Sequence, residues 1–199
     1  MKPIFYLAPV RGITTRVFRN VFPKHFKGFD IAVAPFIAAK RKDKIIGAYI
    51  REFEPGANSG LKTIPQILTG DPEEFISLAD CLSDTGYDMI NWNLGCPYPM
   101  VVNRGMGAAL IQYPDKIDSF LEKTIPRVKS KISVKLRLGM AGADEILRVL
   151  PVFNRYPLHE IIIHSRTADQ MYEGAVDLDS FEKCLPLSKH EVVYNGDIN

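Results

Sequence analysis

The sequence predicts an α/β fold, a (β/α)8 barrel of the TIM type, on three observations. Short and nearly continuous apolar runs alternate along the chain with segments whose apolar residues recur at helical spacing. Such runs are typical of parallel strands that helices cover on both faces. Polar or glycine-containing segments follow most of the runs, as they do at the C-terminal rim of a barrel. No G-x-G-x-x-G follows the first run, which disfavours the alternative, a doubly wound sheet that binds a dinucleotide.

Length and composition indicate one ordered domain over residues 1–199. Hydrophobic residues make up 46% of the chain and charged residues 24%, so a sizeable core can form. The apolar part of the N-terminus is too short for a signal peptide, and no apolar run approaches the about 18 residues of a membrane span. We therefore expect a cytoplasmic protein that has no membrane partner. Three cysteines without close spacing support neither a disulfide framework nor a metal site.

The apolar runs predict seven strands, in order residues 4–8, 30–34, 64–68, 89–92, 133–137, 160–164 and 192–195. A closed barrel of this type has eight strands. We therefore expect a barrel that is truncated after its seventh strand, in a chain that is the N-terminal part of a longer protein. Two unpaired strand edges would then be exposed, which favours aggregation.

Helices are predicted between these strands. Asp71 supplies an N-cap before a proline at the first helical position, and Glu74 supplies the acidic residue of a capping box. An apolar stripe follows and stops before Gly86, which predicts a helix between these points. The later helices are predicted over residues 114–128, 143–155 and 177–184.

Cys96 follows the fourth predicted strand, in the segment Asn93-Leu94-Gly95-Cys96-Pro97. Proline has no amide hydrogen for a strand ladder, and the glycine permits a backbone shape that other residues avoid, so the strand stops here. The thiol then lies at the rim where barrel enzymes carry their chemistry. We interpret Cys96 as functional, and Cys81 and Cys184 as core residues on apolar helix faces.

The same rim collects polar side chains from other strands. Lys135 and Arg137 alternate with apolar residues, so both point to one face of their strand. A lysine inside a barrel needs an anionic partner, which is either a protein carboxylate or a ligand. The Gln66 amide needs either backbone groups or a ligand that offers both donors and acceptors, such as a flavin ring. His164 is either a core histidine or part of the site.

Positive charge is concentrated in the first third of the chain. Residues 1–62 contain 12 Lys and Arg against 4 Asp and Glu. The densest stretch is Lys40-Arg41-Lys42-Asp43-Lys44, which is either a solvated surface or a site for a polyanion such as RNA.

Seven motifs together resemble the tRNA-dihydrouridine synthase family, flavin enzymes that reduce a uracil in tRNA. They occur in the order that is typical of the family, and they cover nearly the whole chain. The motifs are Ala8-Pro9-Val10-Arg11-Gly12-Ile13-Thr14 with Phe18-Arg19, Pro65-Gln66-Ile67-Leu68-Thr69-Gly70, Asn93-Leu94-Gly95-Cys96-Pro97, Gly105-Met106-Gly107-Ala108-Ala109-Leu110, Val134-Lys135-Leu136-Arg137-Leu138-Gly139, His164-Ser165-Arg166-Thr167 with Gln170-Met171-Tyr172-Glu173-Gly174, and Asn195-Gly196-Asp197-Ile198.

This resemblance implies a TIM-barrel catalytic domain with FMN across its mouth and tRNA as the partner. NADPH or NADH would reduce FMN, the flavin would deliver hydride to uracil C6, and Cys96 would give a proton to C5. The expected cofactor-binding residues are Ala8, Pro9, Gln66, Lys135, His164, Asn195, Gly196 and Asp197. The expected substrate-binding residues are Asn93, Arg137 and Tyr172. The eighth strand and a C-terminal helical tRNA-binding domain would lie outside this chain.

Two other functions stay open at this point. The first is another FMN barrel oxidoreductase that acts on a small molecule, of the dihydroorotate dehydrogenase or ene-reductase type. The second is a non-catalytic tRNA-binding fragment. No motif points to a protein partner, and hydrolase signatures such as G-x-S-x-G and H-E-x-x-H are missing from the sequence.

Overall fold

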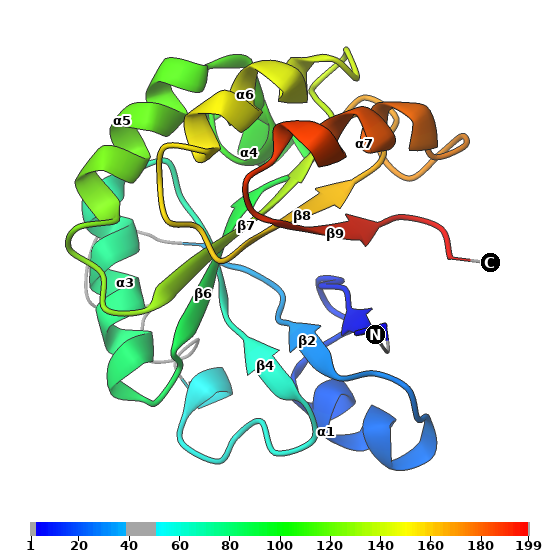
Figure 1. The fold of residues 1–199 in the computed structure, drawn as a ribbon. Coiled ribbons are helices and arrows are strands. Elements are labelled where there is room, and N and C mark those ends of the chain that lie inside the picture. The colour runs from blue at the N-terminus through cyan, green and yellow to red at the C-terminus, as the bar shows by residue number, and fades with distance from the viewer. Residues whose placement is uncertain (1–2, 39–50, 199) are drawn as a thin grey trace.

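The computed structural model describes residues 3–38 and 51–198, so the basic stretch from Lys40 to Lys44 lies outside the described residues. Strands and helices alternate from the N-terminus to the C-terminus (Figure 1). The strands are β1 (Tyr6–Leu7), β2 (Ile31–Val33), β3 (Ile37–Ala38), β4 (Lys62–Ile64), β5 (Gln66–Leu68), β6 (Met89–Leu94), β7 (Lys131–Arg137), β8 (Glu160–His164) and β9 (Glu191–Asn195). The helices are α1 (Arg16–His25), α3 (Pro72–Asp84), α4 (Pro99–Val102), α5 (Pro114–Thr124), α6 (Glu145–Phe153) and α7 (Leu178–Cys184), with 3-10 turns η1 (Arg51–Phe53), η2 (Gly107–Gln112) and η3 (Leu185–Leu187).

All strand pairs in the described chain are parallel, which confirms the α/β class. A three-stranded sheet has the order β1-β2-β4, and a six-stranded sheet has the order β3-β5-β6-β7-β8-β9. The prediction of one strand over residues 64–68 was wrong, because Pro65 separates β4 from β5. Proline cannot donate to a ladder, although the Pro65 carbonyl still accepts from the Asn91 amide at 2.8 Å. Pro35 lies at the corresponding interruption between β2 and β3.

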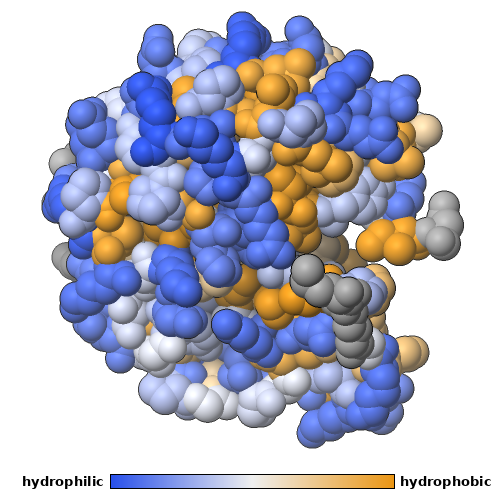
Figure 2. All heavy atoms as spheres, viewed as in Figure 1, coloured by the Kyte–Doolittle hydropathy of each residue, from blue (hydrophilic) through white to orange (hydrophobic). Residues whose placement is uncertain are grey.

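The barrel is not closed, because β1 and β9 do not pair with each other in the described part of the chain. Figure 1 shows both chain ends at this opening. In Figure 2 the same side of the molecule is hollowed, and apolar residues gather beside the hollow. Across the interior, the Tyr6 hydroxyl on β1 donates to the Glu160 carboxylate on β8 at 2.8 Å. The truncation itself stays a prediction.

The main core lies between the six-stranded sheet and the helices that cover it. Its largest fully buried side chain is Trp92, whose ring stacks on Phe120 of α5 at a centroid distance of 3.8 Å. Phe75 of α3 meets both rings edge to face. A second, smaller cluster fills the barrel interior with residues such as Val33 and Ile162. These layers hold the strand ends, and therefore the rim, in fixed positions.

The predicted helices are confirmed in outline and differ in detail. The Asp71 carboxylate caps α3 by accepting from the amides of Glu73 and Glu74. The return bond of a capping box is not made, because the Glu74 carboxylate accepts from the Thr69 hydroxyl instead. Helix α5 ends at Thr124, short of the predicted end at residue 128. Helix α1 was not predicted. Within the described residues, no helix combines the length and apolar character that a membrane crossing requires.

Candidate active site

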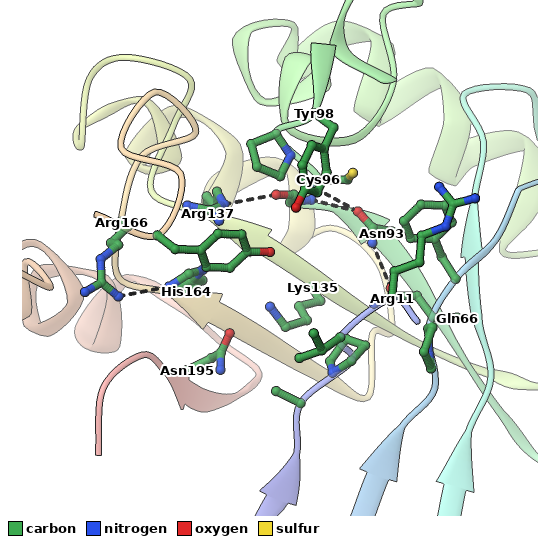
Figure 3. A pocket seen from close by; sticks show the side chains of 18 of the residues that line it. Arg11, Gln66, Asn93, Cys96, Tyr98, Lys135, Arg137, His164, Arg166 and Asn195 are labelled. Carbon is green, nitrogen blue, oxygen red and sulfur yellow. Dashed lines mark hydrogen bonds between the residues drawn. The ribbon is translucent and has the colours of Figure 1, made fainter. Parts of the chain in front are cut away.

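A cavity of about 350 Å³ opens at the C-terminal ends of the strands (Figure 3). All of the residues that were expected to form the site line this cavity, although they come from separate strands and loops. They are Ala8, Pro9, Gln66, Asn93, Cys96, Lys135, Arg137, His164, Tyr172, Asn195, Gly196 and Asp197. Other lining residues were not among the expected site residues, and they include Arg11, Pro35, Phe36, Tyr98 and Arg166. Arg11 and Arg166 could have been predicted at the rim from the sequence, since both follow predicted strands.

Cys96 lies in a loop that its own backbone anchors. Its amide donates to the Asn93 side-chain oxygen at 2.9 Å, and its carbonyl accepts from the Ala108 amide at 3.1 Å. The residue is 7% exposed, and burial raises the pKa of the thiol despite opposing contributions from Arg11 and Arg137. A raised pKa keeps the thiol protonated at neutral pH, as a proton donor requires.

The other two cysteines lie away from the cavity. Cys184 is fully buried on α7, as predicted, and burial raises its pKa to about 11. Cys81 on α3 is half-buried, so the prediction that it is a core residue was wrong in part. Cys81 is not among the buried residues of α3, which are Phe75, Ile76, Leu78, Ala79 and Leu82.

Gly107 lets the chain pass directly behind Cys96. It has a φ of 59°, and an added Cβ would lie 2.7 Å from the Cys96 carbonyl oxygen. We expect Gly107→Ala to lower the free energy of unfolding by about 2–4 kcal/mol, from the left-handed backbone and the clash together. Chemical denaturation measures this change. The matched control is Gly105→Ala, which has a similar φ of 68° but open space around the added Cβ, and for which we expect about 1 kcal/mol. Equal losses in the two variants would contradict the close approach.

Asn93 and Gln66 bind each other inside the cavity wall. The Asn93 side-chain nitrogen donates to the Gln66 oxygen at 2.7 Å, and the Gln66 nitrogen donates to the Asn91 oxygen at 2.7 Å. The Asn93 oxygen also receives the amides of Gly95 and Cys96. Each of the two amides therefore keeps one N–H for a ligand, and most of their hydrogen bonding organises the protein.

Lys135 is partly exposed at the cavity and has no carboxylate within ion-pair distance among residues 3–38 and 51–198. Burial, with a smaller contribution from Arg137, lowers the pKa of its ammonium group to about 7. Of the two partners considered from the sequence, the described residues do not supply a protein carboxylate. A cation in this position favours an anionic ligand.

Arg137 braces two loops at the rim. It is 2% exposed, and its guanidinium donates to the carbonyls of Gly95 and Thr167 at 3.0 and 2.8 Å. The guanidinium also lies 5.2 Å from the centre of the Tyr172 ring. Tyr172 itself is 63% exposed, so its outer face is open to a partner above the cavity.

His164 stays neutral beside three cations. Burial and the charges of Lys135, Arg137 and Arg166 lower its pKa to about 3. Arg166 lies 3.5 Å from the imidazole and pairs with both oxygens of the Asp197 carboxylate at 3.0 and 2.8 Å. Because a guanidinium only donates, Nε2 of the neutral ring accepts from Arg166, and the ring keeps its other N–H to donate.

A barrel-like parallel sheet with its polar cavity at the C-terminal strand ends defines the class of TIM-barrel-like α/β enzymes. Two solved structures agree with this fold. They are a truncated 3-deoxy-D-arabino-heptulosonate 7-phosphate synthase from Thermotoga maritima, with a TM-score of 0.51, 14% identity and coverage of 96% of this chain and 63% of that one, and a GH18 chitinase from Pseudoalteromonas aurantia, with a TM-score of 0.57, 11% identity and coverage of 96% and 79%. At these identities the likeness concerns the fold alone.

The chain belongs to the dihydrouridine synthase family, whose model, Dihydrouridine synthase (Dus), matches residues 6–199. Among curated proteins it is similar to tRNA-dihydrouridine synthase B of Pasteurella multocida, at 27% identity over 100% of this chain and 59% of that protein. The enzymes of the same name from Serratia marcescens and Escherichia coli are each 28% identical over 96% of this chain, and over 57% and 59% of their own lengths. The chain therefore spans about three fifths of the length of these relatives.

Proposed function

We propose that this chain carries the catalytic barrel of an enzyme that uses FMN and NAD(P)H to reduce a specific uridine in tRNA to 5,6-dihydrouridine. One observation carries the proposal: Cys96, a thiol that its raised pKa keeps protonated, and Lys135, a lysine to which the described residues supply no carboxylate partner, open into one cavity. Membership of the dihydrouridine synthase family supports the reaction. Residues 1–199 form the domain in this proposal, and an eighth strand and a helical tRNA-binding domain would lie beyond it.

The donor set of the cavity suits FMN. Lys135 offers a cation to the edge of a reduced flavin, Gln66 offers its remaining N–H, and the neutral His164 offers one N–H donor. Asn195 ends β9, Gly196 and Asp197 follow it at the same rim, and Ala8 and Pro9 offer backbone contacts from the end of β1. Bound FMN, once NAD(P)H has reduced it, would supply the hydride for C6 of the uracil.

The protein's own residues would complete the reduction. Cys96 would give its proton to C5 of the uracil, because its raised pKa keeps the thiol protonated. Lys135 has a pKa of about 7, so negative charge on a neighbouring reduced flavin would favour its protonated form. The ammonium group would then stabilise that charge. Both roles need the buried setting that the loops around Cys96 and Arg137 provide.

The substrate would reach the cavity as a base that has left the RNA stack, which costs a few kcal/mol. Tyr172 offers an exposed ring for stacking, with the guanidinium of Arg137 on its other side. Asn93 keeps one N–H for a carbonyl of the base. Arg11 and the basic segment 40–44 would contact phosphates, which position RNA without selecting its sequence.

The test uses the protein extended to the length of its relatives, purified with FMN. We expect NADPH to bleach its absorbance, and tRNA lacking dihydrouridine to restore the absorbance and gain 2 Da at a uridine. Small enoates should not replace the tRNA. A colourless protein that still binds tRNA would overturn the enzymatic proposal, and reoxidation by enoates alone would favour the small-molecule alternative.

A further inference from the structure

A row of polar side chains lies inside the barrel wall beneath the cavity. Gln66 of β5 is the register partner of Asn91 of β6, and Asn91 is the partner of Ser133 of β7. All three are 0% exposed. Branched apolar residues usually fill the interior layers of such barrels, and a buried polar group is costly unless it is hydrogen-bonded. These three polar side chains can form hydrogen bonds inside the barrel, which apolar residues in the same positions could not.

A continuous network of hydrogen bonds joins this row to the loop that contains Cys96. The Asn91 nitrogen donates to the Ser133 hydroxyl at 2.8 Å, and the Gln66 nitrogen donates to the Asn91 oxygen at 2.7 Å. The Asn93 nitrogen then donates to the Gln66 oxygen at 2.7 Å. The Asn93 oxygen accepts from the backbone amides of Gly95 and Cys96 at 3.1 and 2.9 Å. Figure 3 shows the hydrogen bonds of this network that lie nearest to Cys96.

The backbone amides in the Cys96 loop determine which group donates and which accepts in every hydrogen bond of this network. Backbone N–H groups can only donate, so Asn93 must present its oxygen to the amides of Gly95 and Cys96. Its nitrogen then faces Gln66, which must present its own oxygen. The same reasoning orients Asn91, whose nitrogen is left to meet the Ser133 hydroxyl. Each side-chain amide thus has a single orientation in which all hydrogen bonds of the network are formed.

We propose that Asn91 and Ser133 are positioning residues that hold the Gln66 amide and, through Asn93, the Cys96 loop in place. Neither residue lines the cavity, so both act through Gln66 and Asn93. Removal of the Ser133 hydroxyl leaves the Asn91 nitrogen as a buried donor without a partner, so the Asn91 side chain shifts toward another acceptor and its bond to Gln66 weakens. The shift would pass to Gln66 and Asn93 and loosen the amide of Cys96. The proposal rests on the proposed function only where it concerns turnover.

The first experiment measures the position of the loop without any enzymatic assay. The purified protein and its Ser133→Ala variant are treated with iodoacetamide, and mass spectrometry gives the alkylation rate of each cysteine peptide. We expect Cys96 to react about tenfold faster in the variant, as the loss of one buried hydrogen bond implies. The rates of Cys81 and Cys184 should stay unchanged. Ser130→Ala is the matched control, because the Ser130 hydroxyl bonds only the Tyr87 carbonyl outside this row.

Three outcomes would overturn the proposal. They are an unchanged Cys96 rate in Ser133→Ala, a parallel rise at Cys81 and Cys184 that reports general loosening, and an equal rise in Ser130→Ala. Ser133→Thr keeps the hydroxyl acceptor and should restore the slow rate. In a Gln66→Leu background, Ser133→Ala should have no further effect, because the path to Cys96 is already broken. If Ser133→Ala does not fold, Ser133→Cys, with similar volume and a weak acceptor, replaces it.

A second measurement connects the row to turnover. We expect Ser133→Ala to lower kcat for dihydrouridine formation about tenfold while KM for tRNA stays unchanged, because the variant displaces the proton donor and leaves the RNA contacts intact. An unchanged kcat with faster alkylation would overturn the claim that the row serves catalysis. If the unaltered protein forms no dihydrouridine, the proposed function fails, and the alkylation rates still decide the positioning role.

Discussion

Replacing Cys96 with alanine is expected to slow dihydrouridine formation by about 10²–10⁴-fold, the usual contribution of a positioned acid. The variant should keep its bound FMN and its rate of reduction by NADPH, because alanine removes only the thiol. Rapid-mixing absorbance measurements separate the two half-reactions, since only reoxidation by tRNA needs the proton. A reoxidation rate close to that of the unaltered protein would exclude Cys96 as the acid.

The pH dependence gives an independent check on the same thiol. A proton donor must be protonated, and burial raises the pKa of Cys96 above its ordinary value. The rate of reoxidation by tRNA should therefore fall only when the pH rises past the usual range for a thiol. Cys81→Ala is the matched control, since Cys81 lies on α3 outside the cavity, and it should change neither the rate nor the pH profile.

Lys135→Met is expected to stabilise the ligand-free protein and to weaken its binding of FMN. The lysine pKa falls from an ordinary value of 10.5 to about 7 in the folded state, so the partial desolvation of this cation opposes folding. We expect a gain of about 2–4 kcal/mol in the free energy of unfolding near pH 6–7. Urea denaturation of the FMN-free protein measures this gain, and flavin fluorescence measures an expected loss of FMN affinity of about 100-fold.

The sign of the pH effect follows from the depressed pKa. Between pH 7 and 10.5 the unfolded chain holds a proton on this lysine and the folded chain does not, so the stability of the unaltered protein rises with pH across that window. The advantage of Lys135→Met should shrink over the same window and vanish above it. Lys131→Met, at the exposed start of the same strand, is the control and should show no such dependence. A constant difference between the Lys135 variant and the unaltered protein would contradict the depressed pKa.

The sequence was sufficient for most of the fold because its signals are local. Continuous apolar runs predicted all of the strands that carry the site, and Asp71 with its following proline predicted the start of α3. Proline also caused the main error, since Pro65 divides a run that looked like one strand. Helix α1 was missed because its apolar side chains include exposed ones such as Val17 and Val21, so its pattern does not mark one buried face.

Much of the cavity lining could also be predicted from the sequence, for a topological reason. Parallel strands that are joined by helices bring all of their C-terminal ends to one rim, so polar residues such as Cys96, Lys135 and His164 had to converge. The structure adds Arg166, which pairs with Asp197 across 31 residues of chain. It also adds Arg11, which lies over the Phe36 ring at 5.5 Å.

The sequence by itself determined the fold class, the rim residues and the resemblance to dihydrouridine synthases, since each depends on residue type and order along the chain. Only the tertiary structure decided how those residues are bonded. It joined Ser133, Asn91, Gln66 and Asn93 to the backbone of Cys96. These bonds connect residues up to 42 positions apart, and each depends on strand register and on the direction of a side-chain amide. Register and amide direction are set by the packing of the whole barrel, which local sequence patterns do not encode.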